Sequence, residues 1–320
     1  MEGHLLTDLA IEATQRLRGQ TGGDVPGVTV DEASLEGISI TRVHVTDMGS
    51  QNIGKAPGNY ITIEAPHLKH RNPAYSQQVS QVIAQELQRI LPLPGPAHVF
   101  VVGLGNWRAI ADSLGPRVAS KVLVTRHLGE FLPPDLVQGL RPVSALSPGV
   151  LGITGIETTE IIHGIIQNLK PDAIIAIDAL AAMDVERIMT TIQIADTGIR
   201  PGSGLGTKRP GLNRETIGIP VIAVGVPTVV HAVTIAANTI DLLTRTMAQQ
   251  VQYMRFMQPF AAINKRDLIQ EVLSGVVGNL VVTPKEIDMY IEEVAKVIGG
   301  GLNGALHPGI EESEVMDYLR

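Results

Sequence analysis

An apolar run lies between two aspartates in the segment Asp172-Ala173-Ile174-Ile175-Ala176-Ile177-Asp178. Its length and its isoleucines are typical of a strand that is buried on both faces of a sheet. The helical pattern of residues 157–169 precedes this run, and another apolar run, residues 97–102, lies further upstream and is followed by a glycine turn. Short apolar strands that alternate with helices predict an α/β fold.

The remaining periodicity fits the same architecture. Strands are predicted at 37–47, 59–65, 187–194 and 220–224, and helices at 73–90, 228–243 and 284–306. We expect three layers in one domain spanning residues 1–320: a mostly parallel or mixed twisted sheet with helices on both faces, phosphorylase/hydrolase-like. Catalytic groups of such sheets gather at the carboxyl ends of strands, which directs attention to residues 103–115, 178–180 and 225–228.

The composition narrows the function classes. The 320 residues include 25 basic and 32 acidic side chains, a net charge of −7, and no cysteine. Without cysteine there is no disulfide, cysteine nucleophile, thiolate zinc site or iron–sulfur cluster. The mild acidity leaves no basic footprint, so we expect no direct nucleic-acid partner. The first residues lack the pattern of a signal peptide, which predicts a cytoplasmic protein.

One segment is long enough to span a bilayer. Residues 216–240 carry no Asp, Glu, Lys or Arg. Two prolines and two glycines, Gly218, Pro220, Gly225 and Pro227, divide this segment, which favours a strand, a turn and a helix inside a globular core. We therefore expect no membrane partner.

Several short motifs match known signatures only in part. The turn Gly103-Leu104-Gly105-Asn106-Trp107-Arg108 begins as a dinucleotide-binding loop, but Arg108 takes the place of its third glycine. A non-enzymatic nucleotide-binding module built on this turn stays an alternative. Residues 202–208 resemble a phosphate loop without its Gly-Lys-Ser/Thr order. Asp196-Thr197-Gly198 matches the aspartic-protease triplet, although a turn at a strand end explains it more simply.

Two aspartates are better placed for catalysis. Asp112 follows the first glycine turn and Asp178 ends the run 172–178, so both are expected on the carboxyl edge of one sheet. Poor solvation raises the pKa of such a carboxyl group. Two neighbouring carboxyls can share a proton, so that one activates water while the other donates. A helix N-cap is the alternative for Asp178. His127 and His231 are the histidines expected nearest this edge, with a structural role as their alternative.

A series of segments then resembles one known family. The series is 103–107 (GLGNW), 112–116 (DSLGP), 124–128 (VTRHL), 141–145 (RPVSA), 148–158 (PGVLGITGIET), 176–182 (AIDALAA), 191–199 (TIQIADTGI), 226–230 (VPTVV) and 282–286 (VTPKE). In this order, the segments resemble the germination protease family of spore-forming bacteria, over nearly the whole chain.

This resemblance implies an endopeptidase that degrades small acid-soluble spore proteins in the spore core during germination. It also implies a homotetramer made as a zymogen that removes its own leader. The matching segment is Thr7-Asp8-Leu9-Ala10-Ile11-Glu12-Ala13, with a cut between Asp8 and Leu9 that makes residues 1–8 the leader. The two essential aspartates of the family fall on Asp112 and Asp178, and the mechanism is that of an atypical aspartic peptidase.

The chain also departs from the family pattern. Its leader is short, the variable insert region at 244–266 is reduced, and His231 stands where Asp is expected. These departures bear on zymogen control and on a surface or subunit contact.

The predicted chemistry is direct hydrolysis by Asp112 and Asp178 without a cofactor. Backbone N–H groups of Gly103, Gly105 and Asn106 are candidates to hold the oxyanion. A more distant likeness to hydrogenase-maturation endopeptidases leaves a divalent metal at the two aspartates, and so a metal-dependent peptidase, as an alternative.

Overall fold

The computed structural model describes residues 7–21, 23–131, 133, 140–200, 211–248 and 280–309. Within them, nine strands form one sheet in the order β1-β2-β3-β7-β8-β6-β4-β5, and β9 pairs with β8. The strands are β1 Val28–Leu35, β2 Ile38–Val45, β3 Gly58–Glu64, β4 Val99–Gly103, β5 Val143–Leu146, β6 Ala173–Ala182, β7 Thr191–Ala195, β8 Val221–His231 and β9 Val281–Val282.

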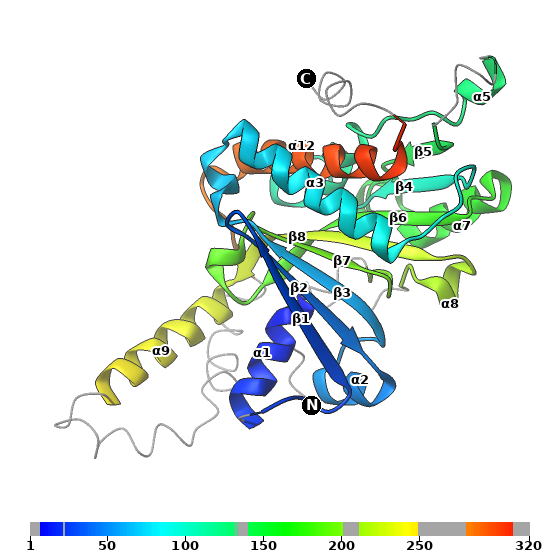
Figure 1. Ribbon diagram of the computed structural model, residues 1–320. Coiled ribbons are helices and arrows are strands. Elements are labelled where there is room, and N and C mark those ends of the chain that lie inside the picture. The colour runs from blue at the N-terminus through cyan, green and yellow to red at the C-terminus, as the bar shows by residue number, and fades with distance from the viewer. Residues whose placement is uncertain are drawn as a thin grey trace.

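Helices lie on both faces of this sheet (Figure 1). The α-helices are α1 Ala10–Thr21, α2 Asp47–Ile53, α3 Pro73–Ile90, α4 Leu114–Ala119, α5 Leu128–Phe131, α6 Leu151–Thr154, α7 Thr158–Leu169, α8 Arg214–Ile217, α9 Ala232–Ala248 and α12 Ile287–Leu306. Three short 3-10 helices are η1 Pro66–His70, η2 Ile110–Asp112 and η3 Val185–Arg187.

The sheet has a parallel half and an antiparallel half. Strands β5, β4, β6 and β8 run parallel, whereas β1, β2, β3 and β7 pair antiparallel with their neighbours. A two-residue turn joins the antiparallel strands β1 and β2, whereas segments that contain helices separate the parallel strands along the chain, as expected for parallel pairs. The predicted α/β fold with a mixed sheet is confirmed.

Alternating side chains of the strands build two cores. On one face, α3 and α12 pack against Ile175, Ile177 and Val224. On the other face, Ile162 of α7 packs with Phe100, Ile174 and neighbouring residues, and the start of α1 packs on β2 and β3. Figure 1 shows α3 and α12 together above the sheet and α1 below it. Successive residues of β6 therefore serve opposite faces.

Several predicted boundaries are corrected. The helix predicted at 73–90 is α3, but β6 continues to Ala182, so Asp178 lies inside a strand and is no helix N-cap. Strand β8 extends to His231 and α9 begins only at Ala232, because β6 and β8 pair along this whole stretch. The strand predicted at 187–194 begins at Thr191, after η3. Helix α1 and strand β1 were not predicted.

Among the described residues, no helix is both long and apolar enough to cross a bilayer. The uncharged segment 216–240 instead ends α8, forms β8 and begins α9. Residues 1–6 of the predicted leader, the motif at 202–208 and the part of the predicted insert after Ala248 lie outside the described residues.

Candidate active site

Asp178 occupies an edge of β6 that its neighbour leaves open. Strand β4 ends at Gly103, which pairs with Ile177, so Asp178 is the first residue of β6 beyond the carboxyl end of β4. Its side chain is buried, and its Oδ1 accepts a hydrogen bond of 2.9 Å from the N–H of Ala179. Asp178 was predicted to lie at the carboxyl end of its own strand. It lies instead within β6, beside the carboxyl end of the neighbouring strand β4.

The glycine turn after β4 holds the second aspartate. The N–H of Leu104 donates to the carbonyl of Ile177 at 2.8 Å, and the N–H of Asn106 donates to Oδ2 of Asp112 at 2.8 Å. Gly105 adopts a φ of +113°, and a Cβ there would lie 2.1 Å from the backbone oxygen of Asp112. Only glycine fits this contact. The turn therefore fixes Asp112 beside the end of β4.

The two carboxyl groups influence one another. Burial raises the pKa of Asp178 well above its ordinary value, the charge of Asp112 raises it further, and Asp8 adds to the rise. The hydrogen bond from the N–H of Ala179 acts in the opposite direction and lowers this pKa. Asp112 accepts a hydrogen bond from the Asn106 N–H. Asp178 is thus the member of the pair whose surroundings favour the protonated form.

The predicted cleavage junction lies on the same edge of β6. We call residues 7–10 the junction segment. The N–H of Asp8 donates to the carbonyl of Ala181 at 3.1 Å, and Oδ2 of Asp8 accepts the Ala181 N–H at 3.0 Å. Leu9 is fully buried. The junction segment thus lies along β6 beyond the point where β4 ends.

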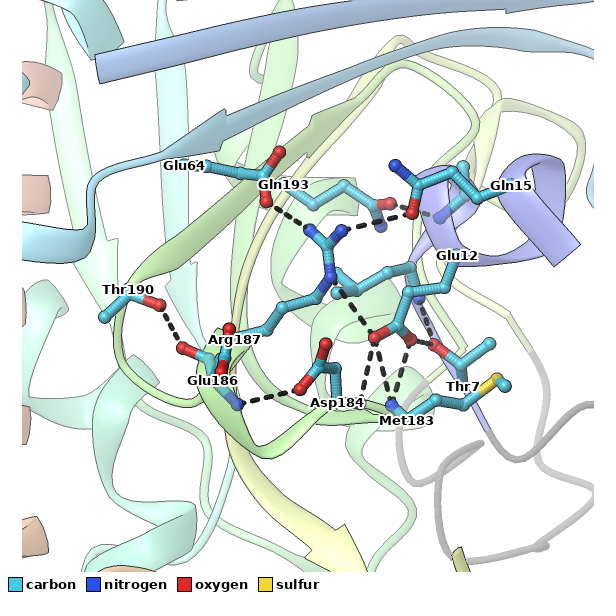
Figure 2. A network of polar contacts seen from close by, with 12 residues as sticks. Thr7, Glu12, Gln15, Glu64, Met183, Asp184, Glu186, Arg187, Thr190 and Gln193 are labelled. Carbon is cyan, nitrogen blue, oxygen red and sulfur yellow. Dashed lines mark hydrogen bonds and ion pairs between the residues drawn. The ribbon is translucent and has the colours of Figure 1, made fainter. Parts of the chain in front are cut away.

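A buried polar network anchors this segment (Figure 2). The carboxylate of Glu12 accepts the N–H groups of Met183 at 2.9 Å and of Asp184 at 3.2 Å, and Thr7 donates its hydroxyl to it. Arg187 lies 3.4 Å from Glu12 through Nε. Burial raises the pKa of Glu12, while Thr7, Met183, Arg187 and Asp184 oppose that rise. Three hydrogen-bond donors and one cation therefore compensate this carboxyl group.

Two sequence candidates lie away from the aspartate pair. The N–H groups of Thr125 and Arg126 both donate to the carbonyl of Val143, the first residue of β5, so exposed His127 lies at the amino edge of the sheet. Helix α4 carries the chain back to that edge before β5 begins. The expectation that His127 lies near the carboxyl edge is wrong.

Asp196 is also at the other edge. Strand β7 runs antiparallel to β8, so its end at Ala195 lies beside Ala223, near the start of β8. The Asp196 carboxylate accepts the backbone and side-chain N–H groups of Asn59 at 2.7 and 2.6 Å. The turn at a strand end, rather than the aspartic-protease triplet, describes this residue.

One of the predicted oxyanion donors, the N–H of Asn106, already has a partner. The Asn106 N–H is bound to Asp112, so the 103–106 turn organises a carboxyl group. In the portion of the chain that the structure describes, no group of three or more His, Cys, Asp or Glu side chains is arranged to hold a metal ion. His231 is buried at the end of β8.

Four residues of the site were missed: Glu12, Lys55, Arg187 and Gln193. Lys55 Nζ and Gln193 Nε2 both contact the carbonyl oxygen of Asp8. Gln193 did give a signal, because it is a polar residue between Ile192 and Ile194 in a buried strand. Nothing in the local sequence shows that Glu12, Lys55 and Arg187 contact distant segments.

Comparison with known proteins identifies relatives of the whole chain. A family model described as "Germination protease" matches residues 6–258 and 247–319. A germination protease of Caldanaerobacter subterraneus subsp. tengcongensis is 48% identical over 318 residues, covering 98% of this chain and 97% of the relative. One from Clostridium acetobutylicum is 48% identical over 321 residues, covering 98% of both. One from Bacillus cereus (strain AH187) is 43% identical over 352 residues, covering 98% of this chain and 96% of the relative.

One solved structure was also compared. It is a [NiFe] hydrogenase maturation protease, HycI, from Thermococcus kodakarensis KOD1, which covers 69% of this chain and 98% of its own at 18% identity. Its TM-score is 0.34.

Proposed function

This chain belongs to the germination protease family, and we propose that it is an endopeptidase that first removes its own residues 1–8 and then degrades small acid-soluble spore proteins. Family membership supports a peptidase of spore germination. The finer proposal concerns the self-cleavage, the substrates and the chemistry. One observation carries it: buried Asp178, which the charge of Asp112 influences, lies on the same edge of β6 as the junction segment.

The chemistry we propose is direct attack by water. The ionised Asp112 takes one proton from water as the water oxygen bonds to the Asp8 carbonyl carbon, and the carbonyl electron pair moves onto its oxygen. The C–N bond then breaks and its electron pair goes to the Leu9 nitrogen, which takes the proton of Asp178. The products are a carboxyl group on Asp8 and a free amino group on Leu9. The raised pKa of Asp178 supports its role as the acid.

Replacement of each aspartate tests this chemistry. Asp112→Asn and Asp178→Asn are expected to slow release of residues 1–8 by about 10³-fold, because each removes a proton-transfer group. The measurement is intact-mass spectrometry of the chain over time. Asp196→Asn is the matched control, because its carboxylate lies at the opposite edge of the sheet, and it is expected to cleave at the wild-type rate.

Retained cleavage in both Asp112→Asn and Asp178→Asn would refute the pair mechanism. An excess of EDTA separates it from metal-dependent hydrolysis, since the pair alone needs no metal. Loss of cleavage in EDTA that zinc or another divalent cation restores would favour a metal at the two aspartates.

A small acid-soluble spore protein is the substrate to use for cleavage in trans. We expect the wild-type chain to cut it and Asp178→Asn to leave it intact, as seen by mass spectrometry. A wild-type preparation that has lost residues 1–8 yet leaves this protein uncut would refute the substrate proposal.

We also propose that the protein assembles as a homotetramer in the spore core. Exposed apolar side chains on α9 support a subunit contact: Ile240, Leu242 and Leu243 are 40%, 67% and 56% exposed. Helix α9 extends away from the sheet in Figure 1. Light scattering coupled to size-exclusion chromatography measures the assembly, and a monomer at micromolar concentration would contradict it.

A further inference from the structure

The carbonyl oxygen of Asp8 is held by two side chains. Lys55 Nζ donates to it at 3.0 Å, and Gln193 Nε2 donates to it at 3.2 Å. A carbonyl oxygen has two lone pairs, and here an amine and a side-chain amide are placed to use them. This carbonyl belongs to the Asp8–Leu9 peptide bond, which is the bond broken in the proposed self-cleavage.

We infer that Lys55 and Gln193 are catalytic residues that bind the carbonyl oxygen of the Asp8–Leu9 bond and stabilise the negative charge that forms on it. This inference rests on the proposed self-cleavage and names the oxyanion donors of that reaction. The donors predicted from sequence were backbone groups of the 103–106 turn, of which the Asn106 N–H is already bound to Asp112.

Gln193 is fixed in the orientation that this role needs. Its Oε1 accepts the N–H of Ala10 at 2.7 Å, which leaves Nε2 directed at the Asp8 carbonyl. Figure 2 shows the Gln193 side chain reaching from its strand toward the start of α1. Because the amide is bound at both ends, it need not reorganise when charge develops, which is the property that makes oxyanion donors effective.

The sheet register places Gln193 and Asp178 in one row. Gln193 of β7 pairs with Gly225 of β8, and Gly225 pairs with Asp178 of β6. Directly paired residues project from the same face of a sheet, and two strand spacings amount to about 10 Å. The acid and the carbonyl donor therefore lie on one face, and the Asp8 carboxylate is near enough to raise the pKa of Asp178.

Lys55 reaches the junction segment from the connection between α2 and β3. Its Nζ also donates to the carbonyl of Thr7 at 3.1 Å. Burial lowers the pKa of Lys55, whereas the carboxylates of Asp8 and Glu12 raise it. A donor with so little water around it acts through a low local dielectric, where attraction to a developing oxyanion is stronger than in solution.

In the proposed reaction these donors act at a single step. When the water oxygen bonds to the Asp8 carbonyl carbon, the carbonyl electron pair becomes a full charge on the oxygen between Lys55 Nζ and Gln193 Nε2. The charge returns to the C=O bond when the C–N bond breaks. No proton or electron passes to either donor.

Self-cleavage of the full-length chain tests the inference. Lys55→Met removes one donor with little change of length, and Gln193→Glu replaces the donating amide by an oxygen while keeping the acceptor for Ala10. Each is expected to slow formation of the chain that begins at Leu9 by about 10²-fold or more, as measured by intact-mass spectrometry. Lys55→Arg keeps a donor and is expected to stay within about tenfold of the wild type.

Lys121→Met is the matched control. Lys121 is also shielded, with 16% of its side chain exposed, but it pairs with Glu292 and makes no contact that the structure shows with the junction segment. This variant is expected to cleave at the wild-type rate. Urea unfolding of every variant separates a folded, slow protein from an unfolded one, and Gln193→Glu decides the question if Lys55→Met does not fold.

The outcomes distinguish this inference from the proposed function. A wild-type chain that keeps residues 1–8 refutes self-cleavage and the inference together. A wild-type chain that loses them, with Asp178→Asn inactive, while folded Lys55→Met or Gln193→Glu cleaves at the wild-type rate, refutes the inference alone. Slow cleavage in both donor variants with normal cleavage in Lys121→Met supports it.

Discussion

Glu12 and Asp178 are two buried carboxyl groups with opposite surroundings. Each is 6% exposed, so both are largely withdrawn from water. Glu12 receives two backbone N–H groups, a hydroxyl and the Arg187 cation. Asp178 receives the N–H of Ala179 and faces the carboxylates of Asp112 and Asp8. Burial raises both pKa values, but at Glu12 the partners oppose the rise and at Asp178 the neighbouring charges add to it.

These different surroundings suit Glu12 to joining segments of the chain and Asp178 to proton transfer. A buried carboxylate with several donors and a cation holds segments together, here α1 and the loop after β6. A buried carboxyl group beside a second one keeps a proton that it can deliver, which is the arrangement expected of a catalytic acid. The junction segment joins the two regions, because Thr7 contacts Glu12 and Asp8 influences Asp178.

Removal of Arg187 should give the largest loss of stability. Arg187 is 11% exposed and lies against both Glu12 and Glu64, so Arg187→Met leaves two carboxylates without their cation. Breaking a buried ion pair from one side costs about 3–5 kcal/mol in the free energy of unfolding. The measurement is the urea midpoint together with its slope.

Arg89→Met is the control for that change. The Arg89 side chain is 62% exposed and lies 3.9 Å from Glu86, so its loss is expected to change stability by no more than about 0.5 kcal/mol. Equal stability of Arg187→Met and Arg89→Met would show that the Glu12 region does not depend on its cation.

Loss of the Glu12 charge alone should have a smaller effect. Glu12→Gln keeps one acceptor oxygen but turns an amide toward the N–H groups of Met183 and Asp184. An unmatched buried donor costs about 1–3 kcal/mol. Urea unfolding measures this loss, and exposed Glu32→Gln is the control. If Glu12→Gln were as stable as Glu32→Gln, the Glu12 carboxylate would not contribute to the stability of the fold.

Sequence patterns predicted the inner strands of the sheet better than its two edge strands, β1 and β5. The helix 73–90 was found because its apolar period, its proline start and its proline-rich end agree. The extension of β6 through Ala179-Leu180-Ala181-Ala182 was missed, because these residues favour helices and they form a strand through pairing with β8 and with Asp8. Strand β1 was missed because most of its residues are exposed and charged residues interrupt its alternation.

The site divides in the same way. Asp112 and Asp178 were predicted as a pair because each follows a short apolar run; the structure places them close enough for the charge of Asp112 to act on Asp178, and their catalytic role stays a prediction. The contacts of Glu12 with Met183 and of Gln193 with Asp8 join residues 171 and 185 positions apart, which no local pattern reveals. His127 was misplaced because the return path of the chain through α4 decides its edge of the sheet. Residues with a local pattern can therefore be predicted from the sequence. Their distant partners become known only when the chain is folded.

Replacement of Asp178 should change stability least, and in the opposite direction. Its folded-state pKa is raised above the ordinary value of 3.8, so the folded protein keeps a proton that the unfolded chain releases. Stability from this group is therefore fully present below about pH 4 and is lost as pH rises through the folded-state pKa. Asp178→Asn cannot ionise, so it should be more stable than the wild type at neutral pH, with a rise in Tm of a few degrees.

The difference between wild type and Asp178→Asn isolates this group. Glu12 also has a raised pKa and contributes a slope of the same sign in both proteins, so it cancels in the difference. The gap in Tm should be small near pH 4 and widen toward neutral pH. A gap that stays constant with pH, or an Asp178→Asn protein that is less stable at neutral pH, would mean that Asp178 is compensated in the same way as Glu12. There would then be no physical reason for Asp178 to hold the proton that the proposed reaction needs.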